Sequence, residues 1–152
     1  EADALKASDV PFEIVPGVTA ACGAAASIGQ SLTERGNLDT LVLTTGHRSD
    51  GFTVPDPIKD IKPGMCVALY MAVGAAPQIV AHLETCHPNV SFDVQVVAKA
   101  QRKGQIVLNC PLGDLARTLN VHDITGEAML FVRWSFGVQA LDGASTRALA
   151  TV

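Results

Sequence analysis

The amino-acid sequence predicts an α/β fold, a three-layer α/β/α domain built around a mixed sheet. Segments with strand character alternate with helix-like segments along most of the chain, which is the pattern of layered α/β domains. The strand-like segments are almost continuously apolar, which is typical of a sheet that helices cover on both faces. Two of these segments are joined only by the short basic turn QRKG at residues 101–104, which predicts an antiparallel hairpin within the sheet.

The first part of the chain predicts a helix end, a short strand and a helix of small residues. Residues 2–7 have helical spacing, and the polar pair Ser8-Asp9 ends them. Residues 12–15 favour β-structure and predict a short strand. Thr19 has the side chain of a helix N-cap and Gly29 favours a helix end, so we expect a helix of mostly Ala, Gly, Cys and Ser between them.

The later elements follow from apolar runs, breaks and turn residues. They comprise a buried strand at 40–45 that Gly46 breaks, a loop at 49–63, a buried strand at 65–71, a helix at 75–85, strands at 92–100 and 104–110, a helical segment at 112–119 and a strand at 128–134. We predict one domain over residues 1–134 and a poorly ordered or strand-like tail over residues 135–152.

Composition excludes several functional classes. The chain has 152 residues, of which 48% are hydrophobic and 17% charged, so it is long and apolar enough to bury a core. Its net charge of −4, with scattered Lys and Arg, argues against nucleic acid or an anionic membrane as the main partner. The four cysteines lie far apart without a C-x-x-C motif, which we interpret as free, buried thiols in a reducing compartment rather than as disulfides or a metal site. We therefore expect a cytoplasmic protein without a membrane span or a metal.

Three unusual segments fall at the expected carboxyl ends of strands, where ligands bind in α/β sheets. They are PGVTAA at 16–21, TTGH at 44–47 and YMAVG at 70–74. The small-residue helix permits close packing on the sheet or on a neighbouring subunit, while its first turn, beside Thr19, suits a polar or anionic ligand. His47 fits a structural role as well as a binding role, and Met71 fits a core position as well as a contact with a flat apolar ligand. No complete catalytic motif is present, so we assign no catalytic residue.

Five segments, in this order and spacing, resemble the second half of the tetrapyrrole methylases. They are PFEIVPGVTAACGAAASIGQSLTERG, TTGH, YMAVGAAPQIVAHL, VVAKAQRKGQIV followed by PLGDLA, and ITGEAML. The resemblance covers residues 1 to about 132. The TGH and SLTERG segments favour the branch of the uroporphyrinogen-III C-methyltransferases.

The resemblance implies the C-terminal lobe of a two-lobed, homodimeric enzyme. Such an enzyme uses S-adenosylmethionine to methylate uroporphyrinogen III to precorrin-2, toward siroheme or cobalamin. The N-terminal lobe would carry the rest of the cofactor cleft and the acid and base residues proposed for catalysis. We therefore expect this chain alone to be inactive.

The resemblance also assigns site residues. Those matching cofactor positions are Thr19, Ala20, Met71, Ala100, Ala128 and Met129. His47 and Arg48 match the substrate side. Because the implied substrate carries several carboxylates, the candidate cationic partners are Arg35, Arg48, Lys99, Arg102 and Lys103.

Several positions depart from the family pattern. Ala98-Lys99 replaces a usual Glu-Asn, Cys110-Pro111-Leu112 replaces Gly-Thr-Leu, and Arg133-Trp134-Ser135 replaces Gly-Glu-Val. Thr33-Glu34-Arg35 replaces a Thr-His-Arg. These departures bear on substrate identity more than on fold. Two alternatives stay open: a methylase of a later corrin precursor, and a non-catalytic lobe that binds a tetrapyrrole or mediates dimerisation.

Overall fold

A computed structural model describes residues 1–48 and 51–136 and contains a mixed five-stranded sheet. The strand order is β1-β4-β7-β5-β6. The strands are β1 (Thr40–Thr45), β4 (Met65–Tyr70), β5 (Asp93–Ala98), β6 (Ile106–Cys110) and β7 (Ala128–Trp134). A separate two-stranded ribbon joins β2 (His47–Arg48) to β3 (Gly51–Phe52). Most of the predicted tail, residues 137–152, lies outside the described residues.

The strand pairing places one end of each of the five strands at the same end of the sheet. β1 runs parallel to β4, with Thr45 opposite Tyr70 at their carboxyl ends. β7 runs antiparallel to both β4 and β5, so its first residue, Ala128, lies opposite the last residue of β5, Ala98. β5 and β6 form the predicted antiparallel hairpin. The mixed sheet is confirmed, and three strands end where β7 begins.

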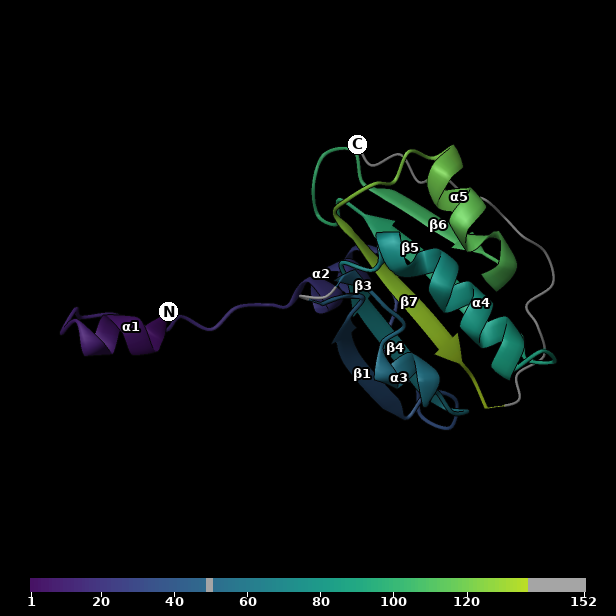
Figure 1. The fold of residues 1–152 in the computed structure, drawn as a ribbon, viewed down its shortest axis with the longest axis horizontal. Helices are drawn as coiled ribbons and strands as arrows, with labels where there is room; N and C mark the ends of the chain where they lie inside the picture. The colour runs from purple at the N-terminus through teal and green to yellow at the C-terminus, as the bar shows by residue number, and fades with distance from the viewer. Residues whose placement is uncertain (49–50, 137–152) are drawn as a thin grey trace.

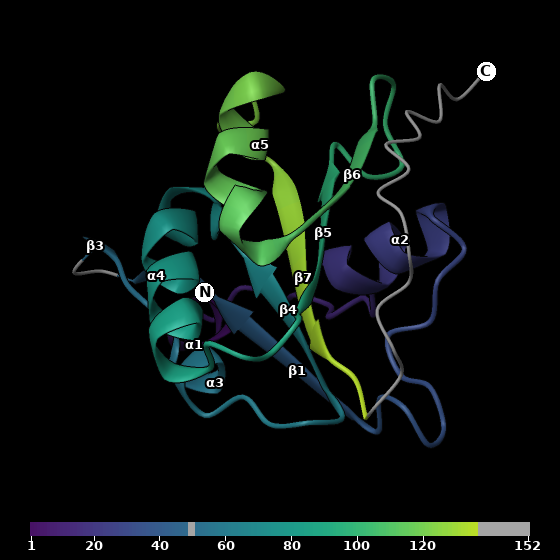
Figure 2. The same cartoon turned by 90° about the vertical axis from the view of Figure 1, so that its right-hand side faces the viewer.

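Helices cover both faces of this sheet, which confirms the three-layer architecture (Figures 1 and 2). On one face lie α3 (Asp56–Lys59), α4 (Ala76–Cys86) and α5 (Leu115–Val121), with the short 3-10 helices η1 (Val73–Ala75) and η2 (Leu112–Asp114) preceding α4 and α5. On the other face lies α2 (Ala20–Ser27), the one helix of the described residues on that side. Because both faces are covered, the central strands need no polar face.

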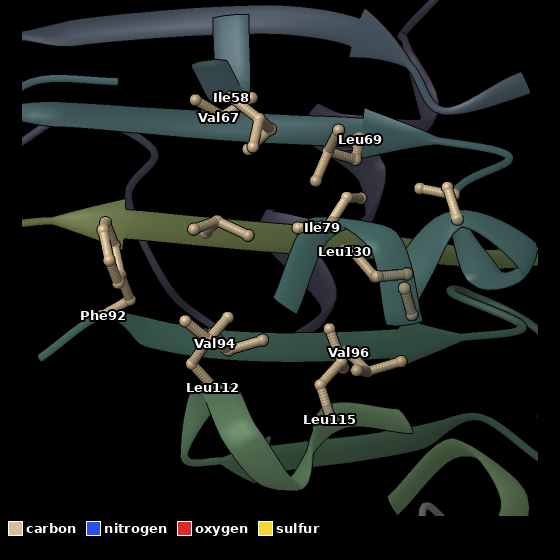
Figure 3. Packing of buried hydrophobic residues seen from close by; sticks show 14 of the residues in the cluster. Ile58, Val67, Leu69, Ile79, Phe92, Val94, Val96, Leu112, Leu115 and Leu130 are labelled. Atoms are coloured by element: carbon tan, nitrogen blue, oxygen red, sulfur yellow. The ribbon is translucent and has the colours of Figure 1, made fainter. Parts of the chain in front are cut away.

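The larger core fills the space between the sheet and α3, α4 and α5. In Figure 3, Leu112 and Leu115 point from the η2–α5 segment toward Val94 and Val96 of β5. On β4, Val67 and Leu69 face this core, whereas Cys66 and Ala68 face α2. The alternation of burial therefore runs between two cores rather than between core and solvent.

The smaller core lies under α2 and depends on small side chains. Ala21 and Ala24 are fully buried against the sheet, beside Phe131 of β7. An alanine side chain occupies little volume, so the backbone of α2 can lie close to the strands. The packing role predicted for the small-residue helix agrees with this arrangement.

Both ends of α2 have the predicted caps. The Thr19 hydroxyl accepts a hydrogen bond from the Ala21 N–H at 3.1 Å. At the other end Gly29 has a φ of +65°, and the N–H groups of Gly29 and Gln30 donate to the carbonyls of Ala26 and Ala25. These two hydrogen bonds form the glycine-terminated helix end known as a Schellman motif.

Removing the Thr19 cap is expected to cost about 1 kcal/mol in the free energy of unfolding. Thr19→Ala removes the hydroxyl that accepts from the Ala21 N–H, whereas Thr19→Ser keeps it. Urea unfolding followed by circular dichroism measures both variants. Equal losses for Ala and Ser would show that the hydroxyl does not stabilise the helix.

Two sequence predictions about the first part of the chain are corrected. Residues 12–15 form no strand, and Ile14 and Val15 are 77% and 76% exposed, because no strand in the described part of the chain offers them backbone partners. The helix predicted over residues 2–7 exists as α1 (Ala2–Ala7), but it buries none of its residues. It stands apart from the sheet at the end of an extended segment (Figure 1).

Two further expectations also needed correction. β1 is only partly buried, with Leu43 45% exposed, since among the described residues it is an edge strand with β4 as its one neighbour. The loop predicted at 49–63 contains the short helix α3, where the fixed φ of Pro57 suits a first helical turn. Ile58 of this helix is fully buried in the larger core.

Candidate functional site

A cleft of about 610 Å³ opens at the end of the sheet where β4 and β5 end and β7 begins. Its size falls within the range of small-molecule sites, about 300–1,000 Å³. The lining residues are Ala20, His47, Tyr70, Met71, Val73, Gly74, Val97, Lys99, Ala100, Arg102, Thr125, Gly126, Glu127, Ala128 and Met129. They come from α2, β2, the β4–η1 connection, the β5–β6 hairpin and the start of β7.

The β4–η1 connection forms one wall of the cleft. Met71 follows the last residue of β4 with a φ of +49°, a left-handed conformation that side chains rarely adopt. Its side chain is 61% exposed at the rim. The Gly46 N–H donates to the Tyr70 carbonyl at 2.8 Å, and this bond holds the end of β4 against the segment that carries His47. Strained backbone at a ligand-sized cleft is typical of binding sites.

The opposite wall joins the β5–β6 hairpin to the start of β7. Lys99 also has a left-handed backbone, with a φ of +51°, and its N–H donates to the Glu127 carbonyl at 3.0 Å. The Arg102 guanidinium lies 2.6 Å from the Glu127 carboxylate, with both side chains largely exposed. The two segments are thus tied by one backbone hydrogen bond and one surface ion pair.

The N-terminus of α2 is linked to the cleft by a hydrogen bond between two hydroxyl groups, one from its N-cap Thr19 and one from Tyr70 of β4. The Thr19 hydroxyl is hydrogen-bonded to the Tyr70 hydroxyl, and the Ala21 N–H also donates to the Tyr70 oxygen at 3.3 Å. A second hollow of about 440 Å³ runs along α2 past Thr19, Cys22 and Gly23 to the hairpin. Ala20 and Ala100 line both hollows, so they mark where the two join.

Most of the sequence-predicted site residues converge on this region. Five of the cofactor candidates line the cleft: Ala20, Met71, Ala100, Ala128 and Met129. Thr19 borders it through its bond to Tyr70 and lines the second hollow. Of the substrate candidates, His47 lines the cleft, and Arg48 follows it in β2.

Arg35 is not brought to the cleft. It is an exposed residue in the turn closed by hydrogen bonds between Glu34 and Leu38. That turn precedes the amino end of β1, whereas the cleft lies beyond the carboxyl end of this strand. Arg35 therefore lies toward the opposite end of the sheet.

Sequence reasoning missed Tyr70 and Glu127 as residues of the cleft. Tyr70 stood next to Met71 in the YMAVG segment, and an aromatic hydroxyl at a strand end was the available signal. Glu127 gave no such signal, because its proximity to Arg102 depends on the pairing of β5 with β7.

The arrangement suits an elongated ligand with a flat apolar part and a polar part. Met71 and Val73 provide apolar surface above the nearly buried Val97 and Met129, while the hydroxyls of Thr19 and Tyr70 lie at one side. Among residues 1–48 and 51–136, no group of three or more His, Cys, Asp or Glu side chains could hold a metal ion. Within the same described residues, no helix is both long enough and apolar enough to cross a membrane.

The chain is similar to proteins of one family. Residues 1–116 match the family described as Tetrapyrrole (Corrin/Porphyrin) Methylases. A siroheme synthase of Gluconacetobacter diazotrophicus is 36% identical over 134 residues, and one of Pseudoalteromonas translucida is 34% identical over 133 residues. Each alignment covers 87% of this chain and 28% of the relative, so the chain spans less than a third of those proteins.

Solved structures agree with the fold. A cobalt precorrin-4 methyltransferase of cobalamin biosynthesis matches with a TM-score of 0.76 and 25% identity, covering 88% of this chain and 56% of that one. A uroporphyrin-III C-methyltransferase from Thermus thermophilus matches with a TM-score of 0.67 and 26% identity, covering 87% and 55%. Another structure of a Thermus thermophilus uroporphyrin-III C-methyltransferase, complexed with S-adenyl homocysteine, matches at 0.64 with 21% identity, covering 85% and 55%.

Proposed function

Because this chain belongs to the tetrapyrrole (corrin/porphyrin) methylases, we propose that its cleft holds S-adenosylmethionine for the methylation of a tetrapyrrole carbon. The observation that carries this proposal is the convergence of α2, the β4–η1 connection, the hairpin and β7 on one ligand-sized cleft. The convergence does not depend on any single short motif, since these segments lie far apart in the sequence.

The residues of the cleft fit such a cofactor. Ala20, Ala100 and Ala128 leave space next to the backbone, where larger side chains would fill the cleft. Met71 and Met129 offer polarisable apolar surface for a flat ring. Thr19 and Tyr70 place hydroxyl groups beside the N-terminus of α2, which suits a polar end. When bound, the cofactor supplies an electrophilic methyl group.

In this proposal the chain's own residues position the reactants. Methyl transfer from a sulfonium to a carbon depends on the alignment of the two atoms more than on a strong base. Met71 and Lys99, both with left-handed backbone conformations, line the cleft from the β4–η1 connection and from the β5–β6 hairpin. His47 and Arg48, at the strand end beside it, are proposed to line the substrate side.

We propose uroporphyrinogen III as the substrate and precorrin-2 as the product. Support comes from the two siroheme synthase relatives, which are more than 30% identical to this chain. A later corrin precursor is a second candidate, because the cobalt precorrin-4 methyltransferase gives the higher TM-score of the two structures at 25% identity or above. Methylation assays of the full-length natural protein with each tetrapyrrole separate these candidates.

We also propose that a second lobe completes the cleft, so that residues 1–152 alone are inactive. The matched structures are nearly twice as long as the part this chain covers. Ala20 and Met71 are exposed at the rim, which leaves part of the proposed cofactor surface open to solvent. Titration calorimetry with S-adenosylhomocysteine tests this for the chain alone and for the full-length natural protein. Binding only in the longer form supports a shared cleft, whereas no binding in either form contradicts the methyltransferase proposal and favours a non-catalytic lobe.

Filling the cleft is expected to weaken S-adenosylhomocysteine binding in the full-length protein by at least about tenfold, or 1.4 kcal/mol. Ala20→Leu introduces a larger side chain into the cleft at an exposed position, so folding tolerates it. Ala81→Leu is the matched control, because Ala81 is an exposed alanine of α4 that does not line the cleft. Calorimetry measures both. Similar affinities for the two variants would place the cofactor elsewhere.

A further inference from the structure

The structure separates the five cations that the sequence offered as partners for a carboxylate. Arg35 lies toward the end of the sheet away from the cleft, and Lys103 lies in the exposed hairpin turn without lining the cleft. Arg102 lines the cleft but is paired with Glu127. Of the four cations whose side chains the structure describes, Lys99 therefore combines two properties: it lines the cleft, and it has no ion-pair partner among residues 1–48 and 51–136.

The charge balance of the cleft depends on this lysine. The described charged side chains that line it are Lys99, Arg102 and Glu127, with His47 as a further titratable group. Because Arg102 and Glu127 neutralise each other, Lys99 leaves the cleft with one net positive charge in a chain whose net charge is −4. The wall opposite is mainly apolar, so this charge is the main electrostatic feature that a ligand would meet.

The backbone conformation at Lys99 is held in place, and this fixes the point from which the side chain extends. Its φ of +51° is a conformation that glycine and asparagine adopt readily and that is unfavourable for most other residues. Two backbone hydrogen bonds hold it, from the Lys99 N–H to Glu127 and from the Arg102 N–H to the Lys99 carbonyl, each 3.0 Å. Glycine or asparagine would suit this turn geometry better than lysine does. The backbone conformation therefore does not account for the lysine, whose side chain is exposed where it lines the cleft.

We propose that Lys99 binds a carboxylate of the ligand in this cleft and so contributes to its specificity. This inference rests on the proposed function. Two sources would supply the carboxylate: the amino-acid part of the cofactor, or an acidic side chain of the tetrapyrrole. In either case the ammonium group donates a charge-assisted hydrogen bond, which is stronger than one between neutral groups.

The test compares Lys99→Asn with Lys103→Asn in the full-length natural protein. Asparagine tolerates the left-handed backbone, so the first variant removes the charge without adding strain. Lys103→Asn removes the same charge four residues along, outside the cleft. The probes are S-adenosylhomocysteine, 5′-methylthioadenosine, which lacks the amino-acid carboxylate, and uroporphyrin III, the unreactive oxidised form of the proposed substrate. Calorimetry or fluorescence quenching gives each dissociation constant at low and high salt.

A carboxylate contact predicts that Lys99→Asn weakens binding of one carboxylate ligand by about 3- to 10-fold and reduces its salt dependence. If the cofactor supplies the carboxylate, S-adenosylhomocysteine loses affinity while methylthioadenosine and uroporphyrin do not. If the tetrapyrrole supplies it, uroporphyrin alone loses affinity. Lys103→Asn is expected to match the wild type in both cases.

Unchanged affinities in Lys99→Asn, with normal binding by the wild type, would overturn this inference and leave the proposed function intact. The same holds if methylthioadenosine is weakened as much as S-adenosylhomocysteine, or if Lys103→Asn has an equal effect. Failure of the wild-type protein to bind any of the three probes would overturn the proposed function and this inference together. Thermal unfolding of both variants confirms that each is folded.

Discussion

Replacing Gly46 with alanine is expected to lower the free energy of unfolding by about 1–3 kcal/mol, as overpacking of a filled core does. A Cβ atom at this position would lie 2.6 Å from the Cβ and 2.7 Å from the Cα of Ala72. Ala72 is fully buried, and it has no flexible side chain that could move aside. The backbone itself must shift to accommodate the new methyl group.

The shift would also reach the cleft. Gly46 donates to the Tyr70 carbonyl and precedes His47, and both of these neighbours line the cleft. We therefore expect Gly46→Ala to weaken S-adenosylhomocysteine binding by the full-length protein as well as to destabilise it. Urea unfolding gives the first effect, and calorimetry below the unfolding temperature gives the second.

Gly23→Ala is the matched control for the stability measurement. Gly23 lies within α2, and a Cβ there meets no atom within 4 Å. Alanine favours a helix over glycine by about 0.5–1 kcal/mol, so this variant is expected to be as stable as the wild type or more stable. Equal destabilisation by both substitutions would show that the contact with Ala72 does not limit residue size at position 46.

The second large effect is expected at Arg133, which is only 4% exposed on the α2 face of β7. Its guanidinium donates to the side-chain oxygens of Asp93 and Gln95, each at 3.2 Å, and of Gln30 at 3.3 Å. It also lies 5.2 Å from the centre of the Phe131 ring. Burial raises the pKa of the neighbouring Cys66 thiol, and the positive charge of Arg133 opposes that rise.

Arg133→Ala is expected to lower the free energy of unfolding by about 2–3 kcal/mol, because it opens a cavity and leaves the Gln95 carbonyl without this donor. Gln95 is 2% exposed, so water does not readily replace the lost bond. Asp93 is 59% exposed and remains hydrated, which keeps the loss below that of a fully buried ion pair. Denaturant unfolding measures the change.

Arg133→Met separates the contribution of bulk from that of hydrogen bonding. Methionine fills much of the same space without donors, so we expect a loss of about 1–2 kcal/mol, smaller than that of alanine. A loss as large as that of Arg133→Ala would mean that the hydrogen bonds, and not the packing of the side chain, determine the stability of this part of the core.

The elements that could be predicted from the sequence are those with strong local signals. The caps of α2 are examples, since the Thr19 hydroxyl and the glycine at position 29 act on backbone groups only two or three residues away. The hairpin between β5 and β6 also followed from a short turn. The strand predicted at residues 12–15 was wrong, because a run of β-favouring residues becomes a strand only if another strand pairs with it.

In the candidate site, too, local sequence signals predicted some residues, and long-range contacts determined the others. The segments PGVTAA, TTGH and YMAVG were placed at strand ends by local pattern, and they contain Ala20, His47 and Met71 of the cleft. The resemblance of other segments to the tetrapyrrole methylases added Ala100, Ala128 and Met129, which also line it. The bond between Thr19 and Tyr70, the pairing of Arg102 with Glu127 and the distance of Arg35 from the cleft were not predictable in this way. Each depends on contacts between residues far apart in the chain.

The sequence by itself determined the order and type of most elements and the mixed character of the sheet, because propensity, periodicity and capping act over a few residues. The family followed from the resemblance of its motifs to the tetrapyrrole methylases. Only the tertiary structure decided that β1 lies at an edge, that Arg133 is buried and that Lys99 lines the cleft without an ion-pair partner among the described residues. These features follow from strand order and register, which bring Ala98 of β5 opposite Ala128 of β7 and Thr45 of β1 opposite Tyr70 of β4. Register is set by the packing of both sheet faces at once, and no single segment of the sequence contains that information.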